Sequence, residues 1–172
     1  KSTFLNTASG EMVSIVSSIP QTTRNAIRGI VNTSFGQLVF VDTPGYHESN
    51  KKMNLKMRNI VADQLANADS ILYVVDSTRP CGDEEKLITE LLKGHEKKTV
   101  AALNKIDEKD SNPSAARVFL SKQLPELSEK NIFDVSAKND EGINDVLRAL
   151  YELAPVAPHL YPEEFYTDQE VD

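Results

Sequence analysis

Short apolar runs alternate with segments of helical periodicity along most of this chain, and this alternation constrains its fold most strongly. The runs that predict strands cover residues 27–32, 37–42, 71–75, 99–103 and 132–135. The first two are separated only by a short turn with Gly36, which indicates an antiparallel pair. Helical segments separate the others, as in a parallel sheet. We therefore expect a three-layer α/β fold, with a mostly parallel sheet, one antiparallel strand and helices on both faces.

Apolar residues at helical spacing predict the helices between these strands. They mark residues 53–68, 87–92, 118–124 and 143–150. After these segments the composition changes, because three prolines fall between Pro155 and Pro162 and acidic and polar residues follow. We expect a domain over residues 1–154 and an exit linker over residues 155–172, with the natural protein continuing beyond it.

Composition narrows the functional classes. The 172 residues carry a net charge of −7 at a pI near 5.0, which argues against an RNA-binding surface in this segment. No apolar run approaches the ~20 residues of a membrane span. The single cysteine, Cys81, excludes an internal disulfide within this sequence and fits a reducing cytoplasm. With only three histidines beside it, the composition also argues against zinc.

The motif Asn104-Lys105-Ile106-Asp107 follows the buried run 99–103. At the end of a strand, the two oxygens of Asp107 can accept hydrogen bonds from two adjacent donors. Guanine presents two such donors, N1–H and the exocyclic amine, whereas adenine does not. A buried acceptor left unpaired costs about 1–3 kcal/mol, so this contact can discriminate between the bases. Alone, the motif fits an ordinary polar loop equally well; as part of a site, Asn104, Lys105 and Asp107 are predicted to bind a nucleotide.

The chain begins Lys1-Ser2-Thr3, which matches the end of the phosphate-binding pattern G-x-x-x-x-G-K-S/T. In that interpretation Lys1 reaches the β- and γ-phosphates and the Ser2 hydroxyl binds Mg²⁺. Thr3 begins a helix whose amino end faces the phosphates. The glycines of the pattern and the strand expected before them are not in this sequence, so residues 1–154 would lack the first strand of such a domain; an ordinary chain start is the alternative.

Two further segments suit a phosphate and magnesium site. Asp42 directly follows a strand and can hold Mg²⁺ through water, and the Gly45 amide can bond the γ-phosphate. A threonine hydroxyl from Thr22 or Thr23 can complete the magnesium shell, and Thr23, next to Arg24, is the better candidate. Such a segment would order and release with the nucleotide. Each segment alone also fits an ordinary loop or turn.

Ser136-Ala137-Lys138 follows the last strand, and the Ala137 amide can donate to O6 of guanine. Five motifs thus occur in one order, and four of them lie between a strand and the next element. Together they indicate a GTP-binding domain of the P-loop NTPase class with a Ras-like G-domain fold. Lys1, Thr23 and Gly45 are the predicted catalytic residues, and Ser2, Thr23 and Asp42 are the predicted metal ligands.

At finer grain the chain resembles the Era family of bacterial GTPases. The likeness covers essentially the whole chain and is carried by residues 14–24, 29–30, 41–47, 53–76 and 160–168. Within these, Pro-Gln-Thr-Thr-Arg at 20–24 and Tyr-Pro-Glu at 161–163 differ from the related Der and MnmE GTPases.

The resemblance implies a GTP hydrolase that acts as a switch in small ribosomal subunit assembly and 16S rRNA maturation. It implies a KH domain after residue 172 that binds the rRNA, Mg²⁺ with GTP or GDP, and peripheral contact with the inner membrane. Tyr46 stands where Ras-like GTPases have a glutamine. We therefore expect slow intrinsic hydrolysis, raised by a partner or by K⁺, in a cytoplasmic monomer. The alternatives are a non-hydrolysing guanine-nucleotide binding module and a Der- or MnmE-type GTPase.

Overall fold

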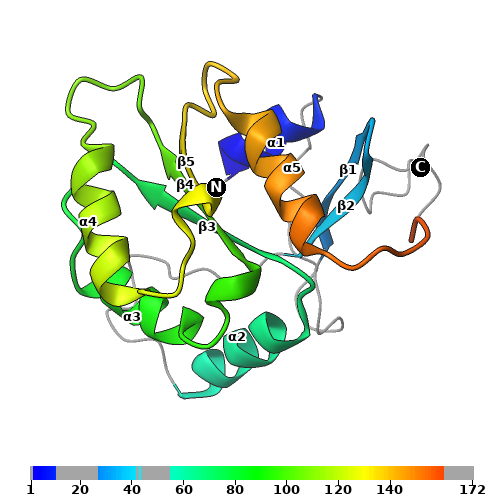
Figure 1. Cartoon of the computed structure of the whole chain (residues 1–172), viewed down its shortest axis with the longest axis horizontal. Helices are drawn as coiled ribbons and strands as arrows, with labels where there is room; N and C mark the ends of the chain where they lie inside the picture. Colours follow the sequence, from blue (N-terminus) through cyan, green and yellow to red (C-terminus); the bar gives the residue numbers. More distant parts are fainter. Residues whose placement is uncertain (1, 11–26, 42, 44–54, 161–172) are drawn as a thin grey trace.

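The computed structural model describes residues 2–10, 27–41, 43 and 55–160 (Figure 1). The strands are β1 (Ile27–Thr33), β2 (Gly36–Val41), β3 (Ile71–Asp76), β4 (Thr99–Asn104) and β5 (Ile132–Val135). The helices are α1 (Ser2–Ser9), α2 (Leu55–Asn67), α3 (Asp83–Leu92), α4 (Pro113–Gln123) and α5 (Ile143–Leu153). Two 3₁₀ turns, Glu96–Lys98 and Glu129–Asn131, lead into β4 and β5. Every predicted strand and helix that falls on described residues is confirmed.

The strands form two sheets where the sequence predicts one. β1 and β2 make an antiparallel hairpin, and β3, β4 and β5 make a parallel sheet in the order β3-β4-β5. A continuous sheet requires backbone hydrogen bonds between each pair of neighbouring strands. Within the described part of the chain, β2 pairs with β1 alone and β3 with β4 alone, so no strand pairing joins the hairpin to the parallel sheet.

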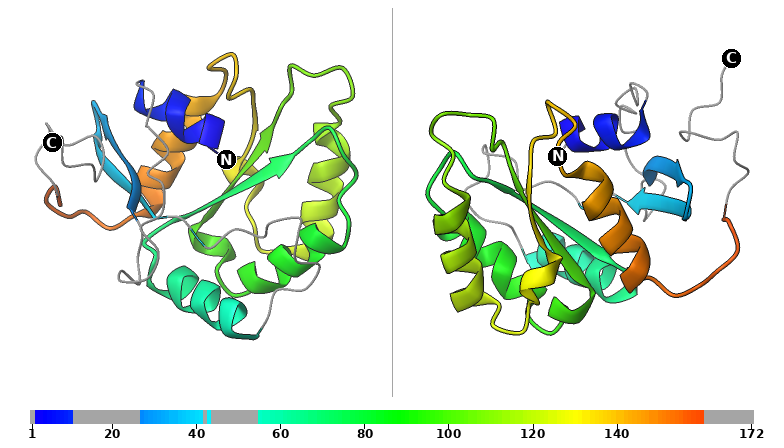
Figure 2. Two further views of the ribbon diagram at one scale, coloured as in Figure 1. Left: turned by 180° about the vertical axis from the view of Figure 1, so that it is seen from behind. Right: turned by 45° about the horizontal axis from the view of Figure 1, so that its top comes forward.

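β4 is the centre of the parallel sheet, and all six of its residues are buried. Because successive side chains of a strand point to opposite faces, β4 contributes to two separate apolar cores. Ala101 and Leu103 pack in the core beneath α2, α3 and α4. Val100 and Ala102 pack in the core shared with α1, α5 and the β1–β2 hairpin. Figure 2 shows helices on both faces of this sheet, which confirms the predicted layering.

α5 has the apolar stripe that the sequence predicts. Ile143, Val146, Leu147 and Leu150 are at most 2% exposed. Burying a side chain of this size stabilises the fold by about 1.5–3 kcal/mol. The helix begins after Gly142, whose φ of 75° is in the left-handed region. A Cβ there would meet the Asp134 carbonyl oxygen at 2.7 Å, so this turn requires glycine.

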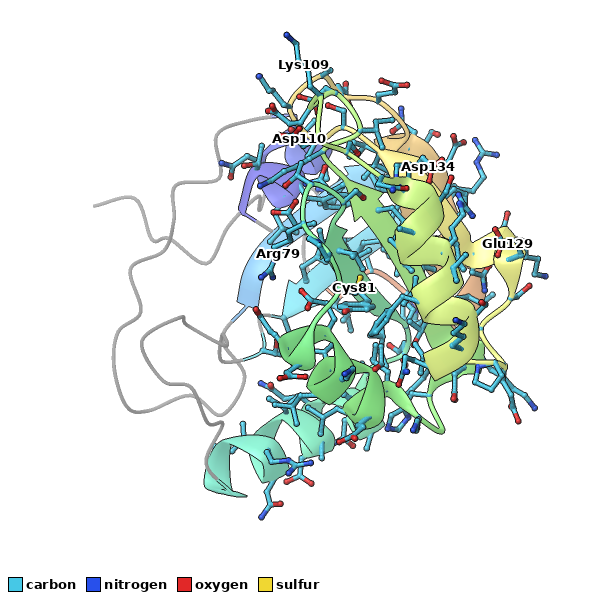
Figure 3. All side chains as sticks on the ribbon, turned by 90° about the vertical axis from the view of Figure 1, so that its left-hand side faces the viewer. Arg79, Cys81, Lys109, Asp110, Glu129 and Asp134 are labelled. Atoms are coloured by element: carbon cyan, nitrogen blue, oxygen red, sulfur yellow. The ribbon has the colours of Figure 1, made fainter. Side chains whose placement is uncertain are left out.

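Polar contacts set where α3 and α4 begin. The Gly82 amide donates a 2.8 Å hydrogen bond to Glu85 Oε2, which satisfies a backbone donor just before α3. Asn112 Oδ1 accepts from the Ala115 amide at 3.0 Å, and Pro113 occupies the first position of α4. Arg117 of α4 then pairs with Asp134 of β5 at 2.9 Å and also with Glu129, which Figure 3 shows on the same side of the molecule.

None of the described helices combines the length and the apolar character that crossing a bilayer needs.

Candidate nucleotide-binding site

The carboxyl ends of β3, β4 and β5 meet at one edge of the parallel sheet. The register pairs Asp76 with Asn104, and Asn104 with Val135, so these strands end at the same level. Ligands of open α/β sheets bind outside this edge. The predicted motifs at 104–107 and 136–138 both begin there, as does the loop after Asp76.

Asn104 connects the two predicted base-binding motifs. It is 8% exposed, and its Oδ1 accepts a 3.0 Å hydrogen bond from the Ala137 amide. The backbone adds a second link, since the Ile106 amide donates to the Val135 carbonyl at 3.3 Å. A buried side-chain oxygen needs a partner, and here the partner comes from the other motif. The role of Asn104 visible in the structure is therefore to hold the two loops together.

Asp107 is held by Ser136. The Ser136 hydroxyl, which is fully buried, donates a 2.6 Å hydrogen bond to Asp107 Oδ1. It also accepts from the Asn139 amide at 3.2 Å, which fixes the direction of its proton. This hydrogen bond is the largest of the effects that hold the pKa of Asp107 below its usual value; Lys138 and Lys105 nearby add to it. Asp107 is consequently an ionised, oriented acceptor.

Lys105 is turned back toward β3. Its backbone has φ of 73°, which a residue with a Cβ seldom adopts, and its Nζ lies 2.7 Å from Asp76 Oδ2. The other Asp76 oxygen accepts from the Thr78 amide at 3.0 Å and from the Thr78 hydroxyl at 2.6 Å. Burial alone would raise the pKa of Asp76, but the hydrogen bonds from Lys105 and Thr78 outweigh it and lower that pKa to about 2. Asp76 is thus a charged anchor for Lys105.

α1 contacts the same end of the molecule. Phe4 is fully buried and anchors this helix in the core that it shares with α5. Thr3, a predicted nucleotide contact, is exposed. The half-buried Thr7 donates its hydroxyl to the Ala137 carbonyl at 2.6 Å, 130 positions away in the sequence. α1 is therefore hydrogen-bonded directly to the motif at 136–138.

The predicted base-binding residues come together, whereas most of the predicted phosphate and magnesium residues lie outside the described residues. Lys138 is 72% exposed, with Nζ 3.9 Å from both Asp107 and Glu108. Lys109 and Asp110 continue this loop at the rim of the molecule (Figure 3). Five predicted positions lie outside the described residues: Lys1, Thr22, Thr23, Asp42 and Gly45. The same holds for Tyr46 and for the side chain of Ser2.

Two residues of the site escaped prediction. Asp76 could have been found as an acidic residue at the carboxyl end of a buried strand, the same signal that identifies Asp107. Thr7 has no such signal, because its partner is a backbone carbonyl far away in the sequence. Within the described residues, no three His, Cys, Asp or Glu side chains gather in a way that could hold a metal ion.

A parallel α/β sheet with these motifs at its carboxyl edge defines the α/β P-loop GTPase class. The family model described as "50S ribosome-binding GTPase" matches residues 1–105, and the chain belongs to this family.

Among curated relatives, the chain is similar to GTPase Era of Treponema denticola, with 56% identity over 171 residues. This alignment covers 99% of the chain and 58% of that relative. GTPase Era of Borreliella burgdorferi is 38% identical over 172 residues, which is 100% of the chain and 59% of the relative. The chain therefore spans less than two thirds of the relatives it matches. The resemblance to the Era family is confirmed.

Solved Era structures have the same fold. Aquifex aeolicus Era with GDP and AlF4⁻ bound superposes with a TM-score of 0.73 at 29% identity, covering 98% of this chain and 57% of that one. An Era complex with MgGDPNP and nucleotides 1506–1542 of 16S ribosomal RNA gives 0.74 at 30% identity, with the same coverage.

Proposed function

We propose that this chain is the guanine-nucleotide-binding domain of an Era-type GTPase, which binds GTP and GDP and hydrolyses GTP as a switch in small ribosomal subunit assembly. The observation that carries the proposal is the hydrogen bond from Ser136 to Asp107. This bond presents an ionised carboxylate at the carboxyl edge of the sheet. The motifs at 104–107 and 136–138 are also joined there by the hydrogen bond between Asn104 and Ala137.

Guanine selection follows from this arrangement. The Asp107 carboxylate accepts from N1–H and the exocyclic amine, while the Ala137 amide donates to O6. In the structure, that amide donates to Asn104 Oδ1. Its proton is then shared between Asn104 and O6 when guanine is bound, as in a three-centre hydrogen bond. Lys105, which Asp76 anchors, is proposed to contact the nucleotide from the same loop.

The phosphates and Mg²⁺ are assigned to the amino end of α1 and the loop after β2. Lys1, Ser2, Thr3 and Gly45 are proposed to contact phosphate, and Ser2, Thr23 and Asp42 to complete the metal shell. Hydroxyl and carboxylate oxygens are the donors that Mg²⁺ prefers, and MgGDPNP in the solved Era complex agrees with this choice. Bound Mg²⁺ would neutralise charge on the β- and γ-phosphates during transfer. K⁺ is proposed as an activator, because Tyr46 cannot orient water as a glutamine does.

The remaining assignments concern the whole protein. We propose a nucleotide-binding domain that extends upstream of Lys1, with an added strand between β2 and β3, and a linker over residues 155–172. The separate sheets and the partial span of the relatives support this division. A KH domain beyond the linker would bind 16S rRNA; the solved Era complex with that RNA supports this partner. We propose a cytoplasmic monomer with peripheral contact to the inner membrane.

The test uses the natural full-length protein. We expect it to bind GDP at least a hundredfold more tightly than ADP, and Asp107→Asn to lose that preference. Asparagine offers an amide donor at this position, so the variant should gain affinity for XDP, whose base has a carbonyl in place of the exocyclic amine. Equal binding of GDP and ADP by the unsubstituted protein would contradict the proposal.

Hydrolysis is tested separately. Phosphate release in a single turnover with Mg·GTP distinguishes a GTPase from a non-hydrolysing binding module. We expect slow release that is faster in K⁺ than in Na⁺. Equal rates in the two salts would remove the potassium assignment, and no release above the uncatalysed rate, with or without ribosomal subunits, would favour the binding module.

A further inference from the structure

Thr7 makes a hydrogen bond that neither the base motifs nor the phosphate motifs include. Its hydroxyl on α1 donates to the Ala137 carbonyl at 2.6 Å, a short distance for a neutral hydroxyl donor. Ala137 is 1% exposed, so its carbonyl needs a partner from the protein. The partner comes from α1, the helix that begins at Ser2.

Ala137 is thereby held on both sides. Its amide donates to Asn104 Oδ1 at 3.0 Å, and its carbonyl accepts from Thr7. The first bond attaches it to the loop after β4, and the second attaches it to α1. Ser136, the preceding residue, pairs through both its backbone amide and its carbonyl with Glu141 at 3.0 Å. The orientation of the Ala137 amide is consequently set by three different segments.

We propose that Thr7 is a positioning residue for base selection, whose hydroxyl fixes the Ala137 segment so that its amide is presented to O6 of guanine. The inference rests on the proposed function, since it assumes that guanine binds at this edge. Thr7 touches neither base nor phosphate; it acts through Ala137. It also connects the helix that begins at the phosphates with the loop that reads the base.

A purely structural role would have different consequences. If Thr7 only stabilised α1, its loss would weaken binding of every purine nucleotide equally and lower the melting temperature. If it positions the Ala137 amide, its loss should specifically weaken recognition at the 6-position of the base. Recognition of the 2-amine, which depends on Asp107 and Ser136, should remain, because Thr7 contacts neither.

Two nucleotide analogues test recognition of the 6-position and of the 2-amine of the base separately. 6-Thio-GDP keeps N1–H and the exocyclic amine but replaces O6 by sulfur, a weaker acceptor, so the affinity ratio of GDP to 6-thio-GDP reports the Ala137 contact. IDP lacks only the exocyclic amine, so the ratio of GDP to IDP reports the Asp107 contact. Both ratios are measured by calorimetry on the natural full-length protein.

Thr7→Val preserves the shape of the side chain and removes the hydroxyl, whereas Thr7→Ser keeps the hydroxyl. We expect Thr7→Val to lower the GDP to 6-thio-GDP ratio about three- to tenfold, the range of one neutral hydrogen bond, with the GDP to IDP ratio unchanged. Thr7→Ser should retain both ratios. Thr89→Val is the matched control, because Thr89 also donates its hydroxyl to a backbone carbonyl, that of Lys86 in α3, away from the site.

An unchanged GDP to 6-thio-GDP ratio in Thr7→Val overturns the inference while leaving the proposed function intact, and so does an equal loss in both ratios. If the unsubstituted protein binds no GDP, the proposed function fails and the inference fails with it. Should Thr7→Val not fold, Thr7→Ala compared with Thr7→Ser provides the same contrast.

Discussion

The hydroxyl of Ser136 donates a 2.6 Å hydrogen bond to the carboxylate of Asp107, 29 positions earlier in the chain. The two residues follow neighbouring parallel strands, β5 and β4, and the register brings their loops together. The bond orients one carboxylate oxygen and stabilises the charged form of the group. Under the proposed function, Ser136 therefore keeps Asp107 ionised to lower pH and supports base recognition without touching the base.

Ser136→Ala should weaken GDP binding about three- to tenfold at neutral pH, because Asp107 loses the donor that orients it. The folded pKa of Asp107 is below its usual value, so the ionised form persists as the pH falls, until that folded pKa is reached. Without Ser136, the loss of binding should begin at a higher pH. Calorimetric titrations with GDP from pH 7 down to pH 3 measure this, with Ser121→Ala in α4 as the control. Identical pH profiles for Ser136→Ala and the unsubstituted protein would contradict the role of Ser136.

Asp76→Asn should remove a pH-dependent part of the stability. The folded pKa of Asp76 is about 2 and its ordinary value is 3.8. A carboxylate with a depressed folded pKa contributes stability above its unfolded pKa, and this is lost as the pH falls from 3.8 toward 2. Because the pair with Lys105 is partly exposed, we expect no more than about 1 kcal/mol.

The measurement is urea unfolding of Asp76→Asn and of the unsubstituted protein at several pH values. The difference in the free energy of unfolding should be largest above pH 4 and shrink below it. Asp83→Asn is the control, since the Asp83 side chain is fully exposed and its ion pair is 3.5 Å long. A difference that is constant over the whole pH range would show that Asp76 contributes by something other than charge.

Gly36→Ala should destabilise the protein by about 1–3 kcal/mol. Gly36 has φ of 151° in the tight turn between β1 and β2, and a Cβ there would lie 2.1 Å from Tyr151 Cε2. Tyr151 cannot simply move aside, because its ring packs edge-to-face on Phe35 with 5.3 Å between centroids. Thermal unfolding measures the loss. Gly29→Ala is the control, because its Cβ would meet nothing within 4 Å.

A second substitution tests whether the overlap with the Tyr151 ring causes the destabilisation of Gly36→Ala. Adding Tyr151→Ala to Gly36→Ala removes the overlap but not the backbone conformation of the turn. We expect the double variant to lose less stability than the sum of the two single variants. Simple additivity would show that the contact with Tyr151 is not what makes glycine necessary.

Phe4→Ala should cost about 3–5 kcal/mol in unfolding free energy, since Phe4 is fully buried where α1 meets α5. Because Thr7 lies on the same helix, the loss should also loosen the loop at Ala137 and weaken GDP binding. Denaturant titration and calorimetry measure the two effects. Val118→Ala, at an apolar residue of α4 that is 54% exposed, should change neither by much. Full stability in Phe4→Ala would mean that α1 is not part of the core.

Periodicity and strand ends predicted much of this molecule. β5 occupies the predicted residues, and the stripe of α5 is buried as expected. α4 begins at Pro113, before the predicted apolar segment 118–124, because proline suits the first helical position. α3 begins at Asp83, before its first apolar residue, since three acidic residues in its first turn complement the helix dipole. Apolar spacing alone does not detect such a start.

The part of the candidate site that consists of sequence motifs was predictable. Asn104, Asp107, Ser136 and Ala137 come together because parallel strands carry their motifs to one edge. The individual contacts among them were not predictable. For example, no motif indicates that the Ala137 amide donates a hydrogen bond to Asn104 Oδ1. Thr7 could not be found from spacing, because a bond to a backbone carbonyl leaves no pattern in the sequence. The separation into two sheets was also beyond prediction, since alternating strands do not reveal which edges pair.

The burial of β4 on both faces has a consequence for binding kinetics and thermodynamics. All residues of β4 are buried, and such core strands unfold only when the whole domain unfolds. The end of β4 is therefore fixed in the folded protein. Asn104 is the final residue of that strand. A ligand that docks there meets groups already in place and pays little ordering entropy. Under the proposed function, the base would therefore bind to a preorganised site. We expect the nucleotide to dissociate slowly when its phosphates are bound as well.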